Sequence, residues 1–205
     1  MPIVLLVRHA ETEYVRKGRL AGRMPGVPLN KHGREQATAL GERLAALAIK
    51  AVYSSPLERA LETARAIAEP HGIEVVTREG LLETDVGEWQ ERSLKELARL
   101  KEWKALQRTP SLMRFPGGES VPETQHRMCR EIEALCALHD AKDTIACVSH
   151  GDPIRLAVAH FVGLPLDLFQ RLDVIPASVS AVSLGEHGIR LLGLNWHGTF
   201  SLPKA

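Results

Sequence analysis

The residues best placed to do chemistry are polar side chains that directly follow short apolar runs. Arg8 and His9 come after the run Ile3–Val7. His150 comes just after the run Thr144–Val148. Unbroken apolar runs rich in β-branched residues are typical of buried strands, and open α/β sheets bind ligands at the carboxyl ends of such strands. Taken alone, Arg8 and His9 fit the start of a solvated loop equally well.

A third polar corner follows the brief strand expected at Ala51–Tyr53. Ser55 fits the N-cap of the next helix, Pro56 its first position and Glu58 its third, so a capping box is predicted. An acidic residue would suit the first turn better than Arg59 does, because the helix dipole is positive there. This favours a functional role for Arg59 over a solvated position.

The three corners are expected to meet, because the carboxyl ends of parallel strands lie along one edge of a sheet. Two arginines and two histidines would then share one crevice with the helix N-termini expected at Ser55 and Asp152. Guanidinium groups and helix N-termini both favour multiply charged oxyanions such as phosphate. The whole chain has a formal net charge of only +1, so the positive field is local and suits a small anion better than a polymer.

The rest of the chain predicts alternating strands and helices. Helices are expected from an Asn30 cap to about Leu47, from Pro56 to Pro70, from a capping box at Ser93 and Glu96 to about Leu106, from Val121 to about Leu135, and from Pro153, after an Asp152 cap, to Phe161. A loop is expected at Thr12–Leu29, a strand at Ile73–Val76, and a closing pair of strands around Val182–Leu194 that turns at Gly185–Gly188.

This order of elements predicts a three-layer α/β/α sandwich with a mostly parallel central sheet. We expect one domain over residues 1–205, in which residues of about 80–120 form a small inserted cap. That segment interrupts the strand–helix rhythm.

The composition argues against several classes of protein. Nearly balanced charge makes a nucleic-acid binder a poor fit. No stretch approaches the length of a membrane span and the N-terminus lacks the features of a signal peptide, so a cytoplasmic location is expected. Cys129, Cys136 and Cys147 show no paired spacing, which disfavours both a disulfide framework and a zinc site.

Five stretches in order along the chain resemble the motifs of one enzyme family, the histidine phosphatase superfamily of phosphoglycerate mutase-like enzymes. They are Arg8–Thr12 (similar to R-H-G-E-T), Ser54–Ala60 (S-S-P-x-x-R-A), Leu82-Glu83 with Gly87 and Trp89 (L-x-E-x-x-x-G-x-W), Phe115–Ser120 with Arg127, and Ser149–Gly151, which holds the second histidine. The resemblance runs from residue 3 to about 160. Each stretch is a weak signal, but the ordered set is highly specific.

The resemblance implies that His9 is the nucleophile, that Arg8, Arg59 and His150 bind the phosphoryl oxygens, and that Glu83 is the general acid and base. It also implies substrate contacts from Thr12, Ala21, Gly22 and Gly151. The chemistry agrees, because neutral imidazole is a nucleophile near pH 7 and phosphoryl transfer depends mainly on positioning and charge stabilisation. No metal and no other cofactor is expected, since guanidinium groups supply the positive charge.

Some positions leave alternatives open. Asp85 and Glu88 are close enough in sequence to compete with Glu83 for the acid role. Glu119 is explained equally well as a first-turn helix residue. Val15 stands where many family members have an asparagine that contacts phosphate, and the sequence does not show what replaces that contact.

The sequence says little about the alcohol half of the substrate. One loop is rich in basic residues: Arg16, Lys17, Arg19 and Arg23. These residues could bind a second anionic group on the substrate, but a solvated basic surface is the simpler explanation. The cap side of the pocket has four candidate lining residues, of which Trp103 suits helix packing equally well: Trp89, Trp103, Arg114 and Phe115.

The first hypothesis is a phosphomonoester hydrolase that acts on a small phosphorylated metabolite, because Glu83–Trp89 resembles the phosphatase branch of the family. The runner-up is a phosphoglycerate mutase-type transferase, and the third hypothesis is an inactive phosphate-binding module. The expected partner is a small-molecule phosphoester rather than a nucleic acid or a membrane, and a homodimer is retained as an option.

Overall fold

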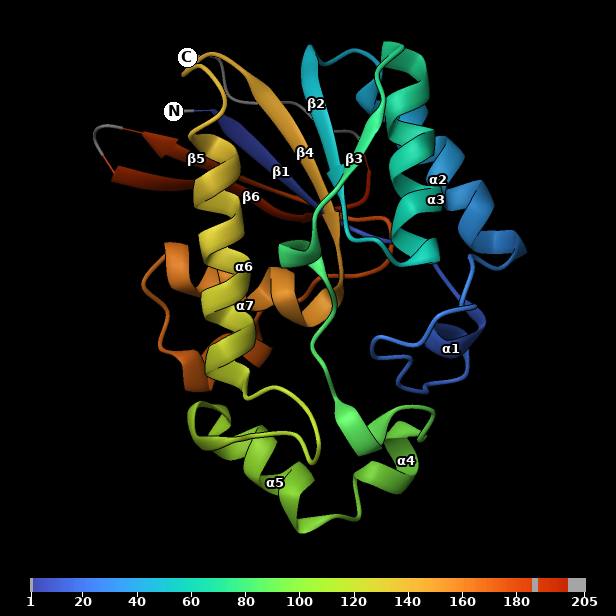
Figure 1. Ribbon diagram of the computed structural model, residues 1–205, viewed down its shortest axis with the longest axis vertical. Coiled ribbons are helices and arrows are strands. Elements are labelled where there is room, and N and C mark those ends of the chain that lie inside the picture. Colours follow the sequence, from blue (N-terminus) through green and yellow to red (C-terminus); the bar gives the residue numbers. More distant parts are fainter. Residues whose placement is uncertain (1, 186–187, 199–205) are drawn as a thin grey trace.

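The computed structural model describes residues 2–185 and 188–198, and within these ranges six strands form one sheet. The strand order is β3-β2-β4-β1-β5-β6 (Figure 1). In chain order the strands are β1 (Ile3–Arg8), β2 (Ile49–Ser54), β3 (Val75–Thr77), β4 (Thr144–Ser149), β5 (Val179–Gly185) and β6 (Gly188–Trp196). The first four are parallel, whereas β5 and β6 pair antiparallel. The predicted parallel sheet with a closing antiparallel pair is confirmed, and residues 186–187 of the predicted turn lie outside the described residues.

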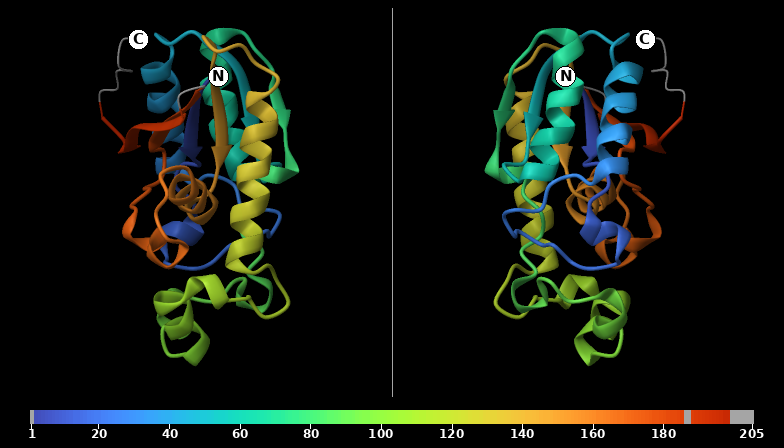
Figure 2. Two further views of the ribbon diagram at one scale, coloured as in Figure 1. Left: turned by 90° about the vertical axis from the view of Figure 1, so that its left-hand side faces the viewer. Right: turned by 90° about the vertical axis from the view of Figure 1, so that its right-hand side faces the viewer.

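Helices cover both faces of the sheet, as predicted (Figure 2). One face carries α2 (Lys31–Leu44) and α3 (Glu58–Ala68), and the other carries α6 (Val121–Cys136) and α7 (Gly151–Phe161). Side chains alternate along β1, so that Leu5 packs with α2 and α3 while Leu6 packs with α6 and α7. Within the described ranges, no helix is long and apolar enough to cross a membrane.

The segment of about residues 80–120 lies beyond the carboxyl ends of the parallel strands (Figures 1 and 2). It contains α4 (Leu94–Leu97), α5 (Lys101–Arg108) and the 3₁₀ turns Glu79–Leu81, Gly87–Trp89 and Pro110–Leu112. Its apolar side chains form a separate cluster that includes Trp89 and Phe115 and that reaches Leu156 on α7. Packing against α7 therefore fixes this segment over one edge of the sheet.

The single helix expected from Ser93 to Leu106 is wrong, because the structure has two short helices there. The predicted capping box at Ser93 and Glu96 is present and opens α4. Leu100 then takes an extended backbone conformation and α5 begins. Leu100 and Trp103 both pack against the apolar cluster of the segment, so tertiary packing overrides a continuous helical pattern.

Two further local predictions are corrected near the sheet edge. The expected loop Thr12–Leu29 contains the four-residue helix α1 (Glu13–Arg16), whose N-cap is Thr12. Asp152 is not the N-cap of α7, because His150 occupies that position and Asp152 lies in the first turn. A single helical turn is too short for periodicity to reveal.

The capping box predicted at Ser55 and Glu58 is also wrong, because α3 begins at Glu58 with no side-chain cap. Ser55 Oγ lies 2.8 Å from His150 Nε2. Glu58 Oε1 accepts a hydrogen bond from the Gly26 N–H at 2.7 Å. Apart from one long hydrogen bond, at 3.5 Å, that Ser55 Oγ accepts from the Leu57 N–H, both side chains bind distant segments.

Other boundaries shift by a few residues. Helix α2 starts after the predicted Asn30 cap but ends at Leu44 rather than Leu47. Strand β3 covers Val75–Thr77 rather than Ile73–Val76. Helix α3 covers Glu58–Ala68 rather than Pro56 to Pro70, and a 3₁₀ turn, Glu69–His71, follows it and ends at Gly72. The three cysteines are buried and free, as predicted.

The close contact between α2 and α3 generates a stability prediction. A Cβ on Gly41 would lie 2.1 Å from the carbonyl oxygen of Ala66. We expect Gly41→Ala to lower the free energy of unfolding by about 1–3 kcal/mol, despite the roughly 1 kcal/mol by which alanine favours a helix. Urea denaturation measures this. Thr38→Ala, exposed on the same helix, should change it by less than about 0.5 kcal/mol; equal losses in both variants would contradict the interpretation.

Candidate active site

Most of the residues proposed from the sequence meet at the carboxyl edge of the sheet. A small cavity of about 100 Å³ is lined by residues that include Arg8, His9, Thr12, Ala21, Gly22, Arg59 and Glu83. Gly151 lines an adjoining cavity of about 370 Å³. His150 is fully buried, and its ring centroid lies 5.1 Å from that of His9 in an edge-to-face arrangement. The fold thus brings together groups that lie more than 140 residues apart in the chain.

His9 is held at the end of β1 in a defined tautomer. Its backbone N–H donates to the carbonyl of Ser149 at 3.0 Å, and its Nδ1 lies 2.7 Å from the carbonyl oxygen of Ala10. Because a carbonyl oxygen only accepts, Nδ1 carries the proton and Nε2 keeps a free lone pair. Burial, together with the charges of Arg59 and Arg8, holds the pKa of His9 well below its ordinary value. His9 is therefore neutral near pH 7, as a nucleophile requires.

The two arginines are each fixed by one backbone carbonyl. Arg8 Nη1 donates to Val174 O at 2.6 Å, and Arg59 Nη2 donates to Gly22 O at 2.7 Å. Arg8 Nε and Arg59 Nη1 are buried and have no hydrogen-bond partner among the described residues. Gly151 allows Arg8 to approach α7, since a Cβ there would lie 3.3 Å from Arg8 Cζ. Buried unpaired donors on charged groups are costly, so these N–H groups are suited to an anionic ligand.

His150 adds a third donor to the site. Ser55 Oγ lies 2.8 Å from His150 Nε2 and also accepts a long hydrogen bond from the Leu57 N–H at 3.5 Å. We assign the Ser55 hydroxyl proton to the contact with His150 Nε2. His150 Nδ1 then carries the ring proton, and this buried atom has no hydrogen-bond partner in the described ranges. Burial and the charge of Arg59 lower the pKa of His150 well below its ordinary value. His150 is thus a neutral donor whose tautomer Ser55 fixes.

Glu83 has the properties of a proton donor and acceptor near neutral pH. Its Oε1 accepts from the Thr84 N–H at 2.9 Å, and its Oε2 lies 3.9 Å from His150 Nδ1. Burial and the nearby charge of Asp152 raise the pKa of Glu83 to about 7, although Arg59 and Arg8 oppose this. Its side chain keeps 20% of its surface exposed, which gives protons a route to solvent.

The competing acids are placed differently. Asp85 Oδ1 accepts from the Gly87 N–H at 3.0 Å and its other oxygen faces Arg23. Glu88 is exposed. The linings of both cavities contain Glu83 but neither of these two acids. The arrangement therefore favours Glu83 as the acid.

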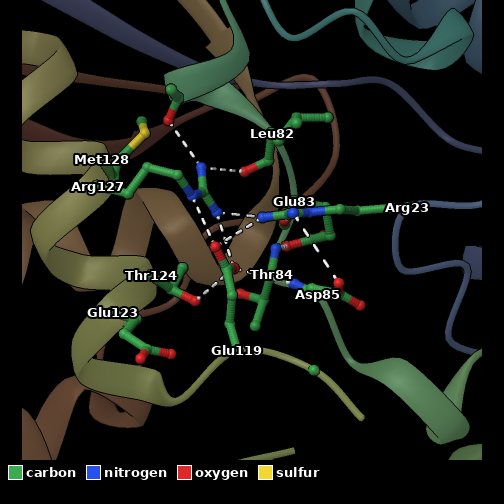
Figure 3. A network of polar contacts seen from close by, with 12 residues as sticks. Arg23, Leu82, Glu83, Thr84, Asp85, Glu119, Glu123, Thr124, Arg127 and Met128 are labelled. Atoms are coloured by element: carbon green, nitrogen blue, oxygen red, sulfur yellow. Dashed lines mark hydrogen bonds and ion pairs between the residues drawn. The ribbon is translucent and has the colours of Figure 1, made fainter.

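A cluster of charged residues holds the Glu83 segment from behind (Figure 3). The Glu119 carboxylate contacts Arg23 Nη2 at 2.7 Å and Arg127 Nε at 2.9 Å. Both guanidinium groups bind the backbone carbonyl of Glu83, Arg23 at 2.8 Å and Arg127 at 3.3 Å. Burial raises the pKa of Glu119, but the hydrogen bond from Arg127 and the charge of Arg23 outweigh it and lower that pKa to about 2. Glu119 is a permanent anion that joins two arginines rather than a first-turn helix residue.

The basic loop contains side chains of two kinds. Arg16 and Lys17 are exposed and pair with Glu13. Arg19 lines the rim of the small cavity, whereas Arg23 belongs to the cluster around Glu119. A solvated surface therefore explains only part of this loop. Val15 also lines the small cavity and offers it no hydrogen-bonding side chain.

The larger cavity corrects two predictions about the cap side. Trp103 and Phe115 line it, as expected. Trp89 is buried behind them, with ring centroids 5.9 Å from Trp103 and 5.3 Å from Phe115. Arg114 lies at the surface and pairs with Glu123. Arg8, Glu83 and Asp152 line both cavities, so the two compartments share one boundary.

Sequence reasoning missed three residues that shape the site. Ser55 was interpreted as a helix cap, Asp152 likewise, and Arg23 as part of a basic surface. Local patterns explained the first two adequately, and only the fold shows that their side chains face the site. Arg23 could have been found from its position in the sequence, because it directly follows Ala21 and Gly22, which were predicted to contact the substrate.

Comparisons with known proteins agree with this geometry. A family model described as histidine phosphatase superfamily (branch 1) matches residues 4–197. The chain is 30% identical over 194 residues to phosphoserine phosphatase 1 of Hydrogenobacter thermophilus, covering 94% of this chain and 91% of that protein. It is 35% identical over 182 residues to a probable phosphoglycerate mutase of Klebsiella pneumoniae, covering 87% and 83% respectively. A mycobacterial glucosyl-3-phosphoglycerate phosphatase, solved in complex with VO3, superposes with a TM-score of 0.86 at 27% identity and covers 95% of this chain and 99% of its own.

The environment of Glu83 predicts an unusual titration. Its carboxyl should be protonated below pH 7 and ionised above it, because burial and Asp152 disfavour the charged form. The ¹³C chemical shift of the Glu83 carboxyl group, followed by NMR of labelled protein from pH 4 to 9, measures the midpoint of this titration. The Glu83→Gln variant identifies the signal by its loss. A midpoint below about pH 5.5, near the ordinary range for glutamate, would contradict the description of the site.

Proposed function

The chain belongs to the histidine phosphatase superfamily (branch 1) and is a phosphoric monoester hydrolase, and we propose that it works by transferring the phosphoryl group of a small metabolite to His9. The observation that carries this proposal is the set of buried donors around the neutral His9 ring: Arg8 Nε, Arg59 Nη1 and His150 Nδ1. Three donors from three elements suit the oxygens of a phosphoryl group. The cavity of about 100 Å³ at this point suits a group of that size.

In the first step of the proposed reaction, His9 Nε2 forms a bond to phosphorus while the bond from phosphorus to the ester oxygen breaks. The departing alkoxide takes the proton of Glu83, which avoids the release of a strongly basic anion. The loose transition state spreads negative charge over the phosphoryl oxygens. Arg8 and Arg59 stabilise that charge from fixed positions, so little reorganisation is needed during the reaction.

In the second step, water attacks the phosphohistidine. The Glu83 carboxylate takes a proton from the water, the N–P bond breaks, and inorganic phosphate leaves with His9 neutral again. One carboxyl must therefore be protonated in the first step and ionised in the second. A pKa of about 7 suits both tasks at neutral pH.

We further propose that the segment of about residues 80–120 acts as a cap on the domain that carries the sheet. It contributes Glu83, Val86, Trp103 and Phe115 to the cavity walls, while the nucleophile comes from β1. The enclosed phosphate end supports a small-molecule substrate rather than a nucleic acid. The cytoplasmic location and the homodimer stay predictions from the sequence.

A mutase is the second candidate, favoured by the 35% identical relative and by Arg19 at the cavity rim. A mutase primed by a bisphosphate must bind a second phosphate, and Arg19 is a cation near the first. The larger cavity supports hydrolysis instead, because its one cation besides Arg8 in the described lining, Arg155, is paired with Asp152 and Asp173.

The experiment that tests the proposed function combines turnover with trapping. We expect the enzyme to release phosphate from phosphomonoesters faster than it isomerises 3-phosphoglycerate primed with the bisphosphate. Rapid denaturation in base should trap a phosphoenzyme that is labile in acid. His9→Ala should remove this trapped species and lower turnover by at least about 10³-fold, since no other nucleophile replaces His9. The mutase becomes the better description if isomerisation is faster, and unchanged turnover in His9→Ala would exclude the mechanism.

The cluster around Glu119 predicts a loss that depends on the leaving group. Arg23→Gln removes a hydrogen bond that positions Glu83, so kcat/KM for an alkyl phosphate should fall about ten- to a hundredfold. The same variant should lose less than about threefold in kcat/KM with p-nitrophenyl phosphate, whose leaving group needs no proton. The comparison uses kcat/KM because this constant covers only the steps up to release of the alcohol, whereas the later attack of water requires Glu83 for both esters.

The matched control is Arg16→Gln, because Arg16 is exposed and pairs with Glu13 at the surface. It should leave both rates unchanged. Equal losses for the two esters in Arg23→Gln would show that Arg23 acts on overall stability rather than on the acid.

A further inference from the structure

We propose that the alcohol half of the substrate is uncharged and carries a flat apolar ring, which the larger cavity binds beside Trp103 and Phe115. The inference rests on the proposed function and names the substrate class of the same site. The cavity of about 370 Å³ adjoins the phosphate end and shares Arg8 and Glu83 with it. A group attached to the ester oxygen would therefore enter this compartment. Its volume lies within the usual range of small-molecule pockets, roughly 300–1,000 Å³.

Apolar side chains form one part of the wall of this compartment, and polar and charged side chains form the rest. The apolar part is formed by side chains from the loop before α2 and from the cap: Leu20, Val86, Leu94, Trp103, Leu106 and Phe115. Leu94 is 40% exposed, although it lies in a chain whose other large apolar side chains are mostly buried. An apolar wall that stays open to a cavity is stabilised when a ligand removes it from water.

The aromatic part of the wall is preorganised. Trp89 is 2% exposed and supports both other rings from behind. Its ring is tilted by 37° to Trp103 and by 86° to Phe115. Such contacts restrict ring rotation, so a flat ligand would meet fixed surfaces and little conformational entropy would be lost on binding.

The charges of the compartment disfavour an anionic alcohol. Arg155 Nη1 lies 3.1 Å from Asp152, and its Nη2 lies 3.8 Å from Asp173. Two carboxylates thus neutralise the cation, and one of them, Asp152, itself lines the cavity. Arg155 keeps one buried Nε–H without a hydrogen-bond partner among the described residues, but the two carboxylates beside it offset its charge. A carboxylate on the substrate would therefore face Asp152 with no net positive charge from Arg155 to bind it. Gln107 and Gln170 supply neutral polar groups instead, which suit hydroxyl or amide substituents on the ring.

The test compares four phosphomonoesters with the full-length enzyme: 2-phenylethyl phosphate, ethyl phosphate, O-phosphoserine and 3-phosphoglycerate. The first two release simple primary alcohols of similar acidity, so the ratio of their kcat/KM values reports binding of the ring rather than leaving-group chemistry. Burial of about 100 Å² of apolar ring surface predicts a preference of roughly 30- to 100-fold for 2-phenylethyl phosphate. The two charged esters should be hydrolysed more slowly than 2-phenylethyl phosphate.

Variants of the wall test whether this preference comes from the compartment. Trp103→Ala should lower the phenylethyl-to-ethyl ratio about tenfold, and Leu94→Ala, a milder change at a half-open position, should lower it about threefold. Turnover of ethyl phosphate reports that each variant is folded. Leu112→Ala changes a side chain of the same segment that is 85% exposed and should leave the ratio as it is.

A ratio below about three, or faster hydrolysis of either charged ester, would overturn the inference while leaving the proposed function intact. An unchanged ratio in both wall variants would also overturn it. If no ester released phosphate and no phosphoenzyme formed, the proposed function itself would fail, and the inference with it.

Discussion

Two buried guanidinium groups, only partly satisfied by protein, are the constraint on which the rest of the site depends. Arg8 and Arg59 each have one carbonyl partner and one buried N–H without a partner among the described residues. Such an arrangement is unfavourable in an empty site and becomes favourable when an oxyanion binds. Burial and, after it, the same two charges lower the pKa of His9 and keep it neutral. Both carbonyl partners, of Val174 and Gly22, lie in loops that connect the helices and strands.

The strands and the convergence of the three corners could be predicted because the local signal and the final fold agree. Apolar runs of the length of Ile3–Val7 and Thr144–Val148 fix where buried strands end, and parallel pairing then brings their ends together. The family resemblance added the division of roles among His9, Arg59 and Glu83. The part of the fold that follows from periodicity and strand ends was therefore accessible from the sequence.

Other features of the structure could not be predicted from the sequence, because the same local sequence pattern is compatible with two different local structures. Ser55 and Glu58 have the spacing of a capping box, yet each side chain makes a tertiary hydrogen bond instead. Nothing near Leu100 in the sequence interrupts a helix, and the break follows from packing of the cap. The role of Arg23 depends on the approach of Glu119, 96 positions later in the chain. Sequence patterns report local preferences, and these three cases were decided by distant partners.

The peptide Gly22-Arg23 spans the site, and its geometry has a mechanical consequence. The carbonyl of Gly22 binds Arg59, while the next side chain binds the backbone of Glu83. Gly22 has a φ of +51°, and a Cβ would lie 2.8 Å from both Gln90 and Val86, so this link has little freedom to adjust. It fixes the separation between Arg59, the proposed phosphoryl ligand, and the backbone of Glu83, the proposed proton donor. Changes elsewhere in the cavity walls would alter which alcohol fits and leave this separation constant.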